Sequence, residues 1–115
     1  MCCLLYKYQL KLIYFFILMV KVIIKKSSNP KKKLMAVFSD DSGKKIKTTH
    51  FGASSSSDYT LHGDEKRKRN YLQRHQKNEN WQDYKSAGSL SRYVLWELKS
   101  KSSAIKAYKR RFNLR

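Results

Sequence analysis

Apolar and polar residues alternate along the segment that begins near residue 19. Val20, Val22 and Ile24 alternate with Lys21, Ile23 and Lys25. Because successive side chains of a strand point to opposite faces, this period of two predicts a half-buried strand. Residues 33–38 form a second apolar run, and residues 44–51 alternate again. Turn-forming residues at 27–30 and 39–43 separate these runs, so we predict three short antiparallel strands joined by hairpin loops.

Helical spacing replaces this alternation after residue 64. Asp64 is placed to cap a helix over residues 65–77, which carries one narrow stripe of half-apolar residues. A polar loop with two aromatic residues, Trp81 and Tyr84, follows at 78–85. The next helix is expected over residues 87–98, with Ser86 as its cap. Leu90, Val94 and Leu98 form its predicted apolar face.

A last short helix is expected to run through residue 112. Ile105, Tyr108 and Phe112 recur at helical spacing, and either Ser102 or Ser103 is placed to start the helix. The sequence therefore predicts an α+β fold, with a small three-stranded antiparallel sheet followed by two or three helices. We expect the helices to cover one sheet face, and the opposite face to be solvated and positive.

Residues 1–18 form an apolar extension that we separate from a single small basic domain over residues 19–115. Lysines interrupt the extension, and its longest uncharged run, residues 12–20, is too short to cross a bilayer. No small-residue cleavage site follows, so a secretory signal is not favoured. The remaining readings are a weak membrane segment, a buried element, or sequence outside the natural protein. We favour the last, because Met19 stands where a compact protein can begin.

The two cysteines, Cys2 and Cys3, are adjacent, which does not suit a disulfide framework or a spaced pair of zinc ligands. Residues 19–115 contain no cysteine. A reducing compartment, whether the cytosol, the nucleus or the interior of a virion, is therefore favoured over secretion.

The net charge of the chain limits the classes of partner that it is expected to bind. The chain has 26 Lys and Arg against 8 Asp and Glu, a formal net charge of +18, and only Lys7 and Lys11 of these basic residues precede residue 19. A compact state with this charge repels itself unless an anionic partner neutralises it. Nucleic acid, acidic protein and acidic lipid are the partner classes that fit.

Two basic clusters with interleaved aromatic residues favour nucleic acid among these partners. Lys and Arg give affinity for phosphates without regard to base sequence, and aromatic faces stack on unpaired bases. The predicted phosphate-contacting residues are Lys66, Arg67, Lys68, Arg69, Arg74, Lys77, Lys106, Lys109, Arg110 and Arg111, and the predicted stacking residues are Tyr71, His75 and Trp81. The alternative reading of each cluster is a solvated helix surface. No recognition-helix or zinc-finger signature is present, so binding by shape and charge is expected.

An ordered series of short motifs resembles a known family. The motifs are His50-Phe51-Gly52-Ala53, Ser57-Asp58-Tyr59-Thr60, Arg74-His75, Leu90-Ser91-Arg92, Leu95-Trp96 and Tyr108-Lys109-Arg110-Arg111-Phe112. Over about residues 19–114 the chain is similar to short basic proteins of unknown function encoded by large DNA viruses of algae and protists. The resemblance implies a viral origin and a place in the virion or in the cytoplasm or nucleus of an infected cell. It implies no catalytic residue.

The leading expectation is a non-enzymatic viral accessory or virion protein that binds DNA or RNA, without a cofactor. The first alternative is a cement or minor capsid protein that binds acidic surfaces of capsid or core proteins, anchored by Trp81, Tyr93 and Trp96. A membrane partner is expected only if residues 1–18 are retained. The third reading is a metal-dependent nuclease built from His50, Asp58, His62, Glu65 and His75, but their spacing matches no metal-ligand motif.

Overall fold

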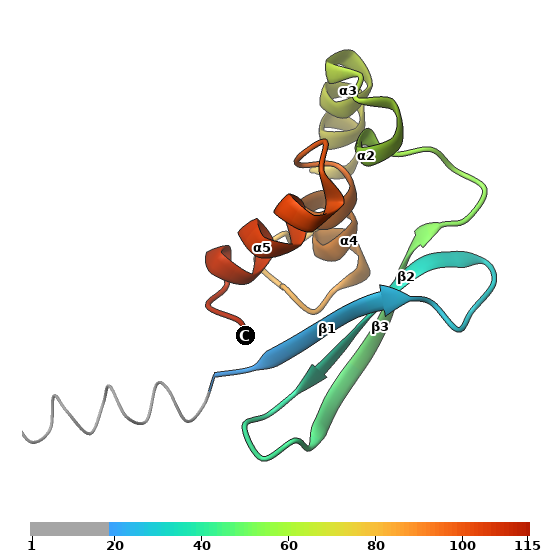
Figure 1. Cartoon of the computed structure of the whole chain (residues 1–115). Helices are drawn as coiled ribbons and strands as arrows, with labels where there is room; N and C mark the ends of the chain where they lie inside the picture. Colours follow the sequence, from blue (N-terminus) through green and yellow to red (C-terminus); the bar gives the residue numbers. More distant parts are fainter. Residues whose placement is uncertain (1–18) are drawn as a thin grey trace, which may run out of the picture.

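A computed structural model gives the structure of the protein and describes residues 19–115. The chain forms, in order, β1 (Lys21–Lys26), β2 (Lys32–Ser39), β3 (Lys45–Ala53), α2 (Tyr59–His62), α3 (Glu65–His75), α4 (Ala87–Leu90), the π-helical turn η1 (Ser91–Leu95) and α5 (Lys101–Arg111). The α+β prediction is confirmed. Figure 1 shows the three strands as one layer and the helices gathered on one side of it.

The sheet is antiparallel, with strand order β1-β2-β3. Val22 faces Phe38 across the first pair of strands, and Leu34 faces Phe51 across the second. These positions follow the predicted period of two, so one face of the sheet carries the large apolar side chains.

The loop between β2 and β3 is built by Asp40 and Gly43. The Asp40 carboxylate accepts hydrogen bonds from the Ser42 hydroxyl (2.6 Å) and from the backbone N–H groups of Lys44 (2.9 Å) and Ser42 (3.0 Å). These bonds, the hydroxyl bond foremost, lower the pKa of Asp40. Gly43 has a φ of 87°, a conformation that glycine adopts at no steric cost. The turn predicted over residues 39–43 is thus held by its own side chain and backbone.

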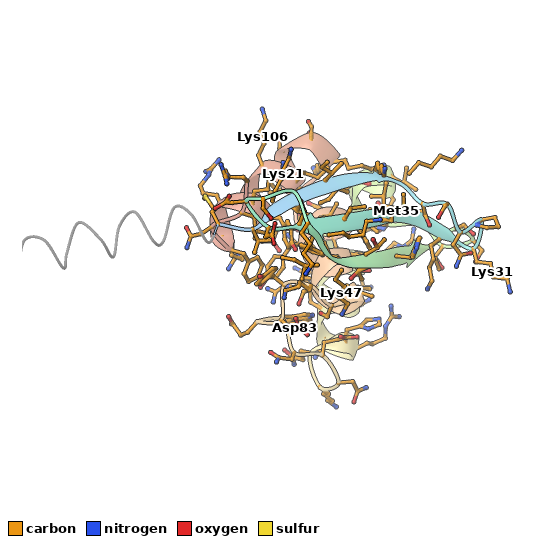
Figure 2. The ribbon with its side chains drawn as sticks, turned by 90° about the horizontal axis from the view of Figure 1, so that it is seen from below. Lys21, Lys31, Met35, Lys47, Asp83 and Lys106 are labelled. Carbon is orange, nitrogen blue, oxygen red and sulfur yellow. The ribbon has the colours of Figure 1, made fainter. Side chains whose placement is uncertain are left out.

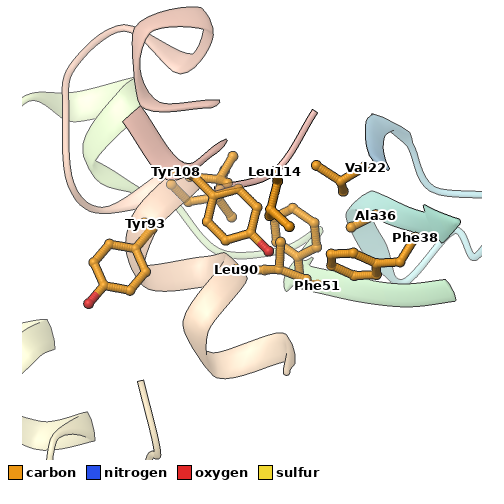
Figure 3. Close-up of a cluster of buried hydrophobic side chains, with 10 residues drawn as sticks. Val22, Ala36, Phe38, Phe51, Leu90, Tyr93, Tyr108 and Leu114 are labelled. Atoms are coloured by element: carbon orange, nitrogen blue, oxygen red, sulfur yellow. The ribbon is translucent and has the colours of Figure 1, made fainter. Parts of the chain in front are cut away.

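The hydrophobic core lies between the sheet and the helices. Phe38 and Phe51 from the sheet, Leu90 from α4 and Tyr108 from α5 are fully buried there, as Figure 3 shows. The Tyr108 hydroxyl donates to the backbone carbonyl of Tyr84 (2.5 Å), so the loop before α4 is tied to α5. Burial raises the pKa of Tyr108. The core therefore joins residues from both ends of the described chain.

The helix predicted over residues 87–98 is shorter than expected. Ser86 caps it as predicted, accepting a hydrogen bond from the Ser89 N–H, but the α-helical part ends at Leu90 and continues as η1 only to Leu95. A π-helical turn widens the helix. In this turn three consecutive residues, Tyr93, Val94 and Leu95, are buried. The predicted core role of Leu98 is wrong, because Leu98 lies after the turn and is 39% exposed.

The start of the last helix also differs from the prediction. Its N-cap is Ser100, whose hydroxyl accepts from the Ser103 N–H, rather than Ser102 or Ser103. A short helix that the sequence did not predict, α2, begins after its cap Asp58 and ends at His62, followed by Gly63 with a φ of 64°. Both differences follow from local hydrogen bonds that several neighbouring polar residues could equally have made.

The last residue of the chain lies beside β1. The Arg115 N–H donates to the carbonyl of Val20 (2.9 Å), and the Val22 N–H donates to the carbonyl of Arg115 (2.8 Å). Leu114 is buried in the core, and Arg115 also forms an ion pair with Asp41. The C-terminal segment therefore covers part of the backbone edge of β1, which would otherwise be open to another strand.

The face of the sheet that points away from the helices is not uniformly charged. Figure 2 views the molecule from this side, with Met35 on the sheet. Ile23 and Ile46 are 47% and 46% exposed, and Val37 pairs with Ile23 across the strands. Lysines of β1 flank these residues. The lysines of this face are exposed, as predicted, but the middle of the face is apolar rather than charged.

Among residues 19–115, no helix is long and apolar enough to cross a membrane. The predicted apolar extension, residues 1–18, lies outside the described residues.

Candidate functional site

A cleft of about 680 Å³ opens between α3, the ends of β2 and β3, and the α4–η1 segment. One side of α3 forms its first wall. The residues of this wall recur at helical spacing: Arg67, Asn70, Tyr71, Arg74 and His75. Residues three and four apart share a helix face, so the sequence of α3 places all five side chains toward the same space. Asp64 starts the helix by accepting from the N–H groups of Lys66 and Arg67.

The second wall comes from β2 and the loop before α2. Lys32 and Lys33 lie at the start of β2, and the Lys33 ammonium donates to the buried carboxylate of Asp58 (2.5 Å). Burial alone would raise the pKa of Asp58, but hydrogen bonds from Lys33 and Thr60 outweigh it and lower that pKa. Lys33 is thus neutralised within the protein, whereas Lys32 is exposed.

An aromatic stack forms the floor between these walls. Tyr71 lies parallel to Trp96, with ring centroids 4.2 Å apart, and its centroid is 4.3 Å from that of His75. Two rings cannot occupy one face of Tyr71 at these separations, so Tyr71 lies between them. Burial, together with the nearby carboxylate of Glu79, raises the pKa of Tyr71 to about 12. Tyr71 therefore stays neutral at physiological pH and has no open face for a base.

Glu79 and Gly88 meet at the far end of the cleft. A Cβ atom at Gly88 would lie 1.9 Å from the Glu79 Oε2 atom, so only glycine leaves room for this carboxylate beside the start of α4. The cleft thus combines cationic side chains on its walls with one carboxylate at its end. Such an arrangement suits a ligand with both an anionic part and hydrogen-bond donors.

Most of the predicted phosphate-contacting residues of α3 are exposed. Lys66, Arg67, Arg69, Arg74 and Lys77 are open to solvent, and of these only Arg67 and Arg74 line the cleft. Lys68 differs, because its ammonium donates to the backbone carbonyl of Glu97 (2.7 Å) and lies over the ring of Tyr59. Lys68 therefore joins α3 to the segment after η1.

The second predicted cluster lies on α5. Lys106, Arg110 and Arg111 are exposed, and Lys109 is half-exposed. The Arg111 guanidinium lies 4.6 Å from the ring centre of Tyr93. Helix α5 packs on η1, and α3 packs on α2. Figure 1 shows α3 above α5 and farther from the sheet, so the two clusters belong to different helices.

Few basic residues of the described chain form ion pairs. Within residues 19–115 the ion pairs are Lys33–Asp58, Arg92–Glu97 and Arg115–Asp41. None of the ten predicted phosphate-contacting residues takes part in them. The charge on α3 and α5 is therefore left for an external anion.

Two of the predicted stacking residues are occupied within the fold. Tyr71 lies inside the stack described above, and Trp81 lies under the Arg92 guanidinium, 4.0 Å from its ring centre. His75 ends the stack, and in the described part of the chain no other aromatic ring packs on its outer face. Tyr93 is buried, and Trp96 has one face on Tyr71, so the anchors expected for capsid binding are largely used internally.

The residues considered for a metal site do not converge. His50 hydrogen-bonds Ser27 on the sheet, Asp58 binds Lys33, and Glu65 accepts from the Tyr59 hydroxyl. His62 accepts from the Asp64 N–H, and His75 stacks on Tyr71. No group of three or more His, Cys, Asp or Glu residues that could hold a metal ion occurs in residues 19–115.

One segment of the chain matches a known protein family. Residues 22–75 match the model of a family of unknown function, DUF5754. The match begins in β1 and ends with α3, so it includes both walls of the cleft and supports an uncharacterised domain. No curated protein and no solved structure matches the chain.

The sequence did not predict the cleft as a unit, nor Lys32, Asn70, Glu79 and Gly88 as residues of it. The spacing of residues 67, 70, 71, 74 and 75 was a readable signal of one helix face. The second wall was not readable, because it depends on how the loop before α2 folds against the start of β2.

Proposed function

We propose that this protein binds nucleic acid, DNA or RNA, through the exposed basic residues of α3 and α5 and without reading base sequence. The observation that carries the proposal is the absence of carboxylate partners for these side chains among residues 19–115. An unpaired surface cation releases condensed counterions when it contacts a phosphate, which is the main source of nonspecific affinity.

The resemblance to proteins of large DNA viruses supports a proposal for where this activity takes place. In the proposed role the protein is a non-enzymatic accessory or virion component, located in the particle or in the infected cell. Its high positive charge would neutralise phosphates where the viral nucleic acid is handled or packed.

Binding of the chain to duplex and single-stranded DNA across a salt series tests this proposal. We expect binding at low salt and a linear fall of log affinity with log salt concentration. Equal affinity for unrelated sequences is also expected. Absence of binding at low salt, or affinity that does not respond to salt, contradicts the proposal.

A second candidate function, attachment to an acidic capsid or core protein, is favoured by the uncovered face of the sheet. Exposed Ile23 and Ile46 lie there beside lysines, a combination that suits a partner with an apolar patch surrounded by carboxylates. Fractionating purified particles into shell and core would separate the two functions. Recovery with the shell alone favours attachment to protein, and recovery with the nucleic acid favours the first proposal.

A further inference from the structure

We propose that the cleft beside α3 binds a single nucleotide, with its phosphate between the arginines of α3 and Lys32 and its base against His75. The inference rests on the proposed function and deepens it, because the bound unit would be an unpaired or terminal nucleotide of the strand held by the basic surface. A free mononucleotide offers the same chemistry.

The size of the cleft fits this ligand. Ligand pockets commonly measure about 300–1,000 Å³, and the cleft measures about 680 Å³. It is open to solvent along exposed residues of α3 and β2, so a nucleotide can enter while it remains attached to its strand.

The phosphate end is set by three cations. Arg67 and Arg74 are seven residues apart on α3, two turns along one face, and Lys32 faces them from β2. None of the three forms an ion pair in the described part of the chain, whereas neighbouring Lys33 is neutralised by Asp58. Guanidinium groups bind phosphate oxygens with two parallel hydrogen bonds, which fixes position as well as supplying charge.

The base end is set by His75 and Glu79. The imidazole of His75 ends the stack on Tyr71 and Trp96, so a base placed on its outer face would extend a rigid aromatic column. The Glu79 carboxylate can accept from a base amino or imino group, while the amide of Asn70, between the two arginines on α3, can donate to the phosphate or sugar.

Glu79 also explains why a nucleotide fits better than a simple anion. Its carboxylate lies in the cleft beside the raised-pKa hydroxyl of Tyr71 and repels negative charge at that end. A ligand with its anion at one end and hydrogen-bond donors at the other satisfies both ends of the cleft. Inorganic phosphate satisfies only one.

The first test titrates the full chain with adenosine monophosphate, uridine monophosphate and inorganic phosphate, followed by the fluorescence of the tryptophans, since Trp96 lines the cleft. We expect saturable binding of both nucleotides and weaker binding of phosphate. A blunt DNA duplex and the same duplex with one unpaired terminal nucleotide then distinguish a strand end from a free nucleotide. Tighter binding of the overhang assigns the site to the strand.

Matched variants locate the site. Arg74→Gln removes a cleft cation, and Lys25→Gln removes an exposed cation of β1 that neither lines the cleft nor belongs to the predicted phosphate-contacting residues. Arg74→Gln should weaken mononucleotide binding about tenfold or more, the scale of a lost charged hydrogen bond, while Lys25→Gln leaves it unchanged. His75→Ala should weaken nucleotides and not phosphate.

The outcomes separate this inference from the proposed function. Binding of long duplex without any mononucleotide binding overturns the cleft assignment and leaves the basic surface in place. Mononucleotide binding without binding of long nucleic acid overturns the proposed function and supports the cleft as a site for a free nucleotide. Equal losses from Arg74→Gln and Lys25→Gln show that the nucleotide is held by general surface charge, which also overturns the cleft assignment.

Discussion

At the scale of single residues, Gly52 shows how closely the sheet and η1 approach. Gly52 has a φ of 78° within β3, and a Cβ atom there would lie 2.7 Å from the Leu95 Cδ1 atom. Gly52→Ala should therefore destabilise the fold by about 1–3 kcal/mol, from backbone strain and the clash together. Urea unfolding followed by far-UV circular dichroism measures the change. Gly43→Ala is the matched control, because Gly43 also has a positive φ but open space around it, so a loss equal to that at Gly52 would show that the contact with Leu95 adds nothing.

The pair Lys33–Asp58 makes stability depend on acid. The folded protein lowers the pKa of Asp58, so its stabilising contribution is complete above the usual aspartate pKa of about 3.9 and is lost as pH falls through the lower folded value. Asp58→Asn should cost on the order of 2 kcal/mol at pH 7, because it leaves Lys33 unpaired in a partly buried site.

Urea unfolding at pH 7 and at several values below pH 4 checks this prediction. The gap between the Asp58→Asn protein and the unchanged protein should narrow as the pH falls, since protonation removes the same charge. Asp83→Asn, at an exposed position, serves as the control. A gap that stays constant down to pH 2.5 would mean that the charge of Asp58 contributes nothing to stability.

At the scale of elements, the strands were more predictable than the helix ends. Val22 and Ile24 alternate with β1 residues that point away from the core, and an alternation of this kind has one structural reading. The end of η1 was not readable, because a π-helical turn arises from the packing of Tyr93, Val94 and Leu95 rather than from local preference. The cleft was not predictable for the same reason, since its two walls meet only through the tertiary fold.

The cap of α5 gives a test at this scale. Ser100 accepts the hydrogen bond that begins the helix, although Ser102 and Ser103 follow closely. Ser100→Ala should destabilise the protein by about 1 kcal/mol, whereas Ser103→Ala, inside the first turn, should have little effect. Thermal unfolding of the two variants at one salt concentration compares them. The opposite order would place the cap within the helix as the sequence first indicated.

At the scale of the whole molecule, the positive charge is divided between surfaces on separate helices. In Figure 2, Lys106 on α5 and Asp83, in the loop between α3 and α4, lie beyond opposite edges of the sheet. If both helices contact a long duplex, each contributes its own share of released counterions, and removing cations from one should leave the share of the other intact. Mutational effects at distant sites add when the sites share no partner.

Charge-removing variants on each helix test this division. Each phosphate contact contributes about 0.9 to the slope of log affinity against log salt concentration. Lys66→Gln with Arg69→Gln on α3 should therefore lower the steepness by up to about two contacts, and Lys106→Gln with Arg110→Gln on α5 by a similar amount, with the combined protein losing the sum. Lys21→Gln with Lys25→Gln, on the uncovered face of the sheet, should leave the slope unchanged. A loss from the sheet variant equal to that from either helix would place the nucleic acid on the sheet, and a loss from only one helix would assign the interface to that helix alone.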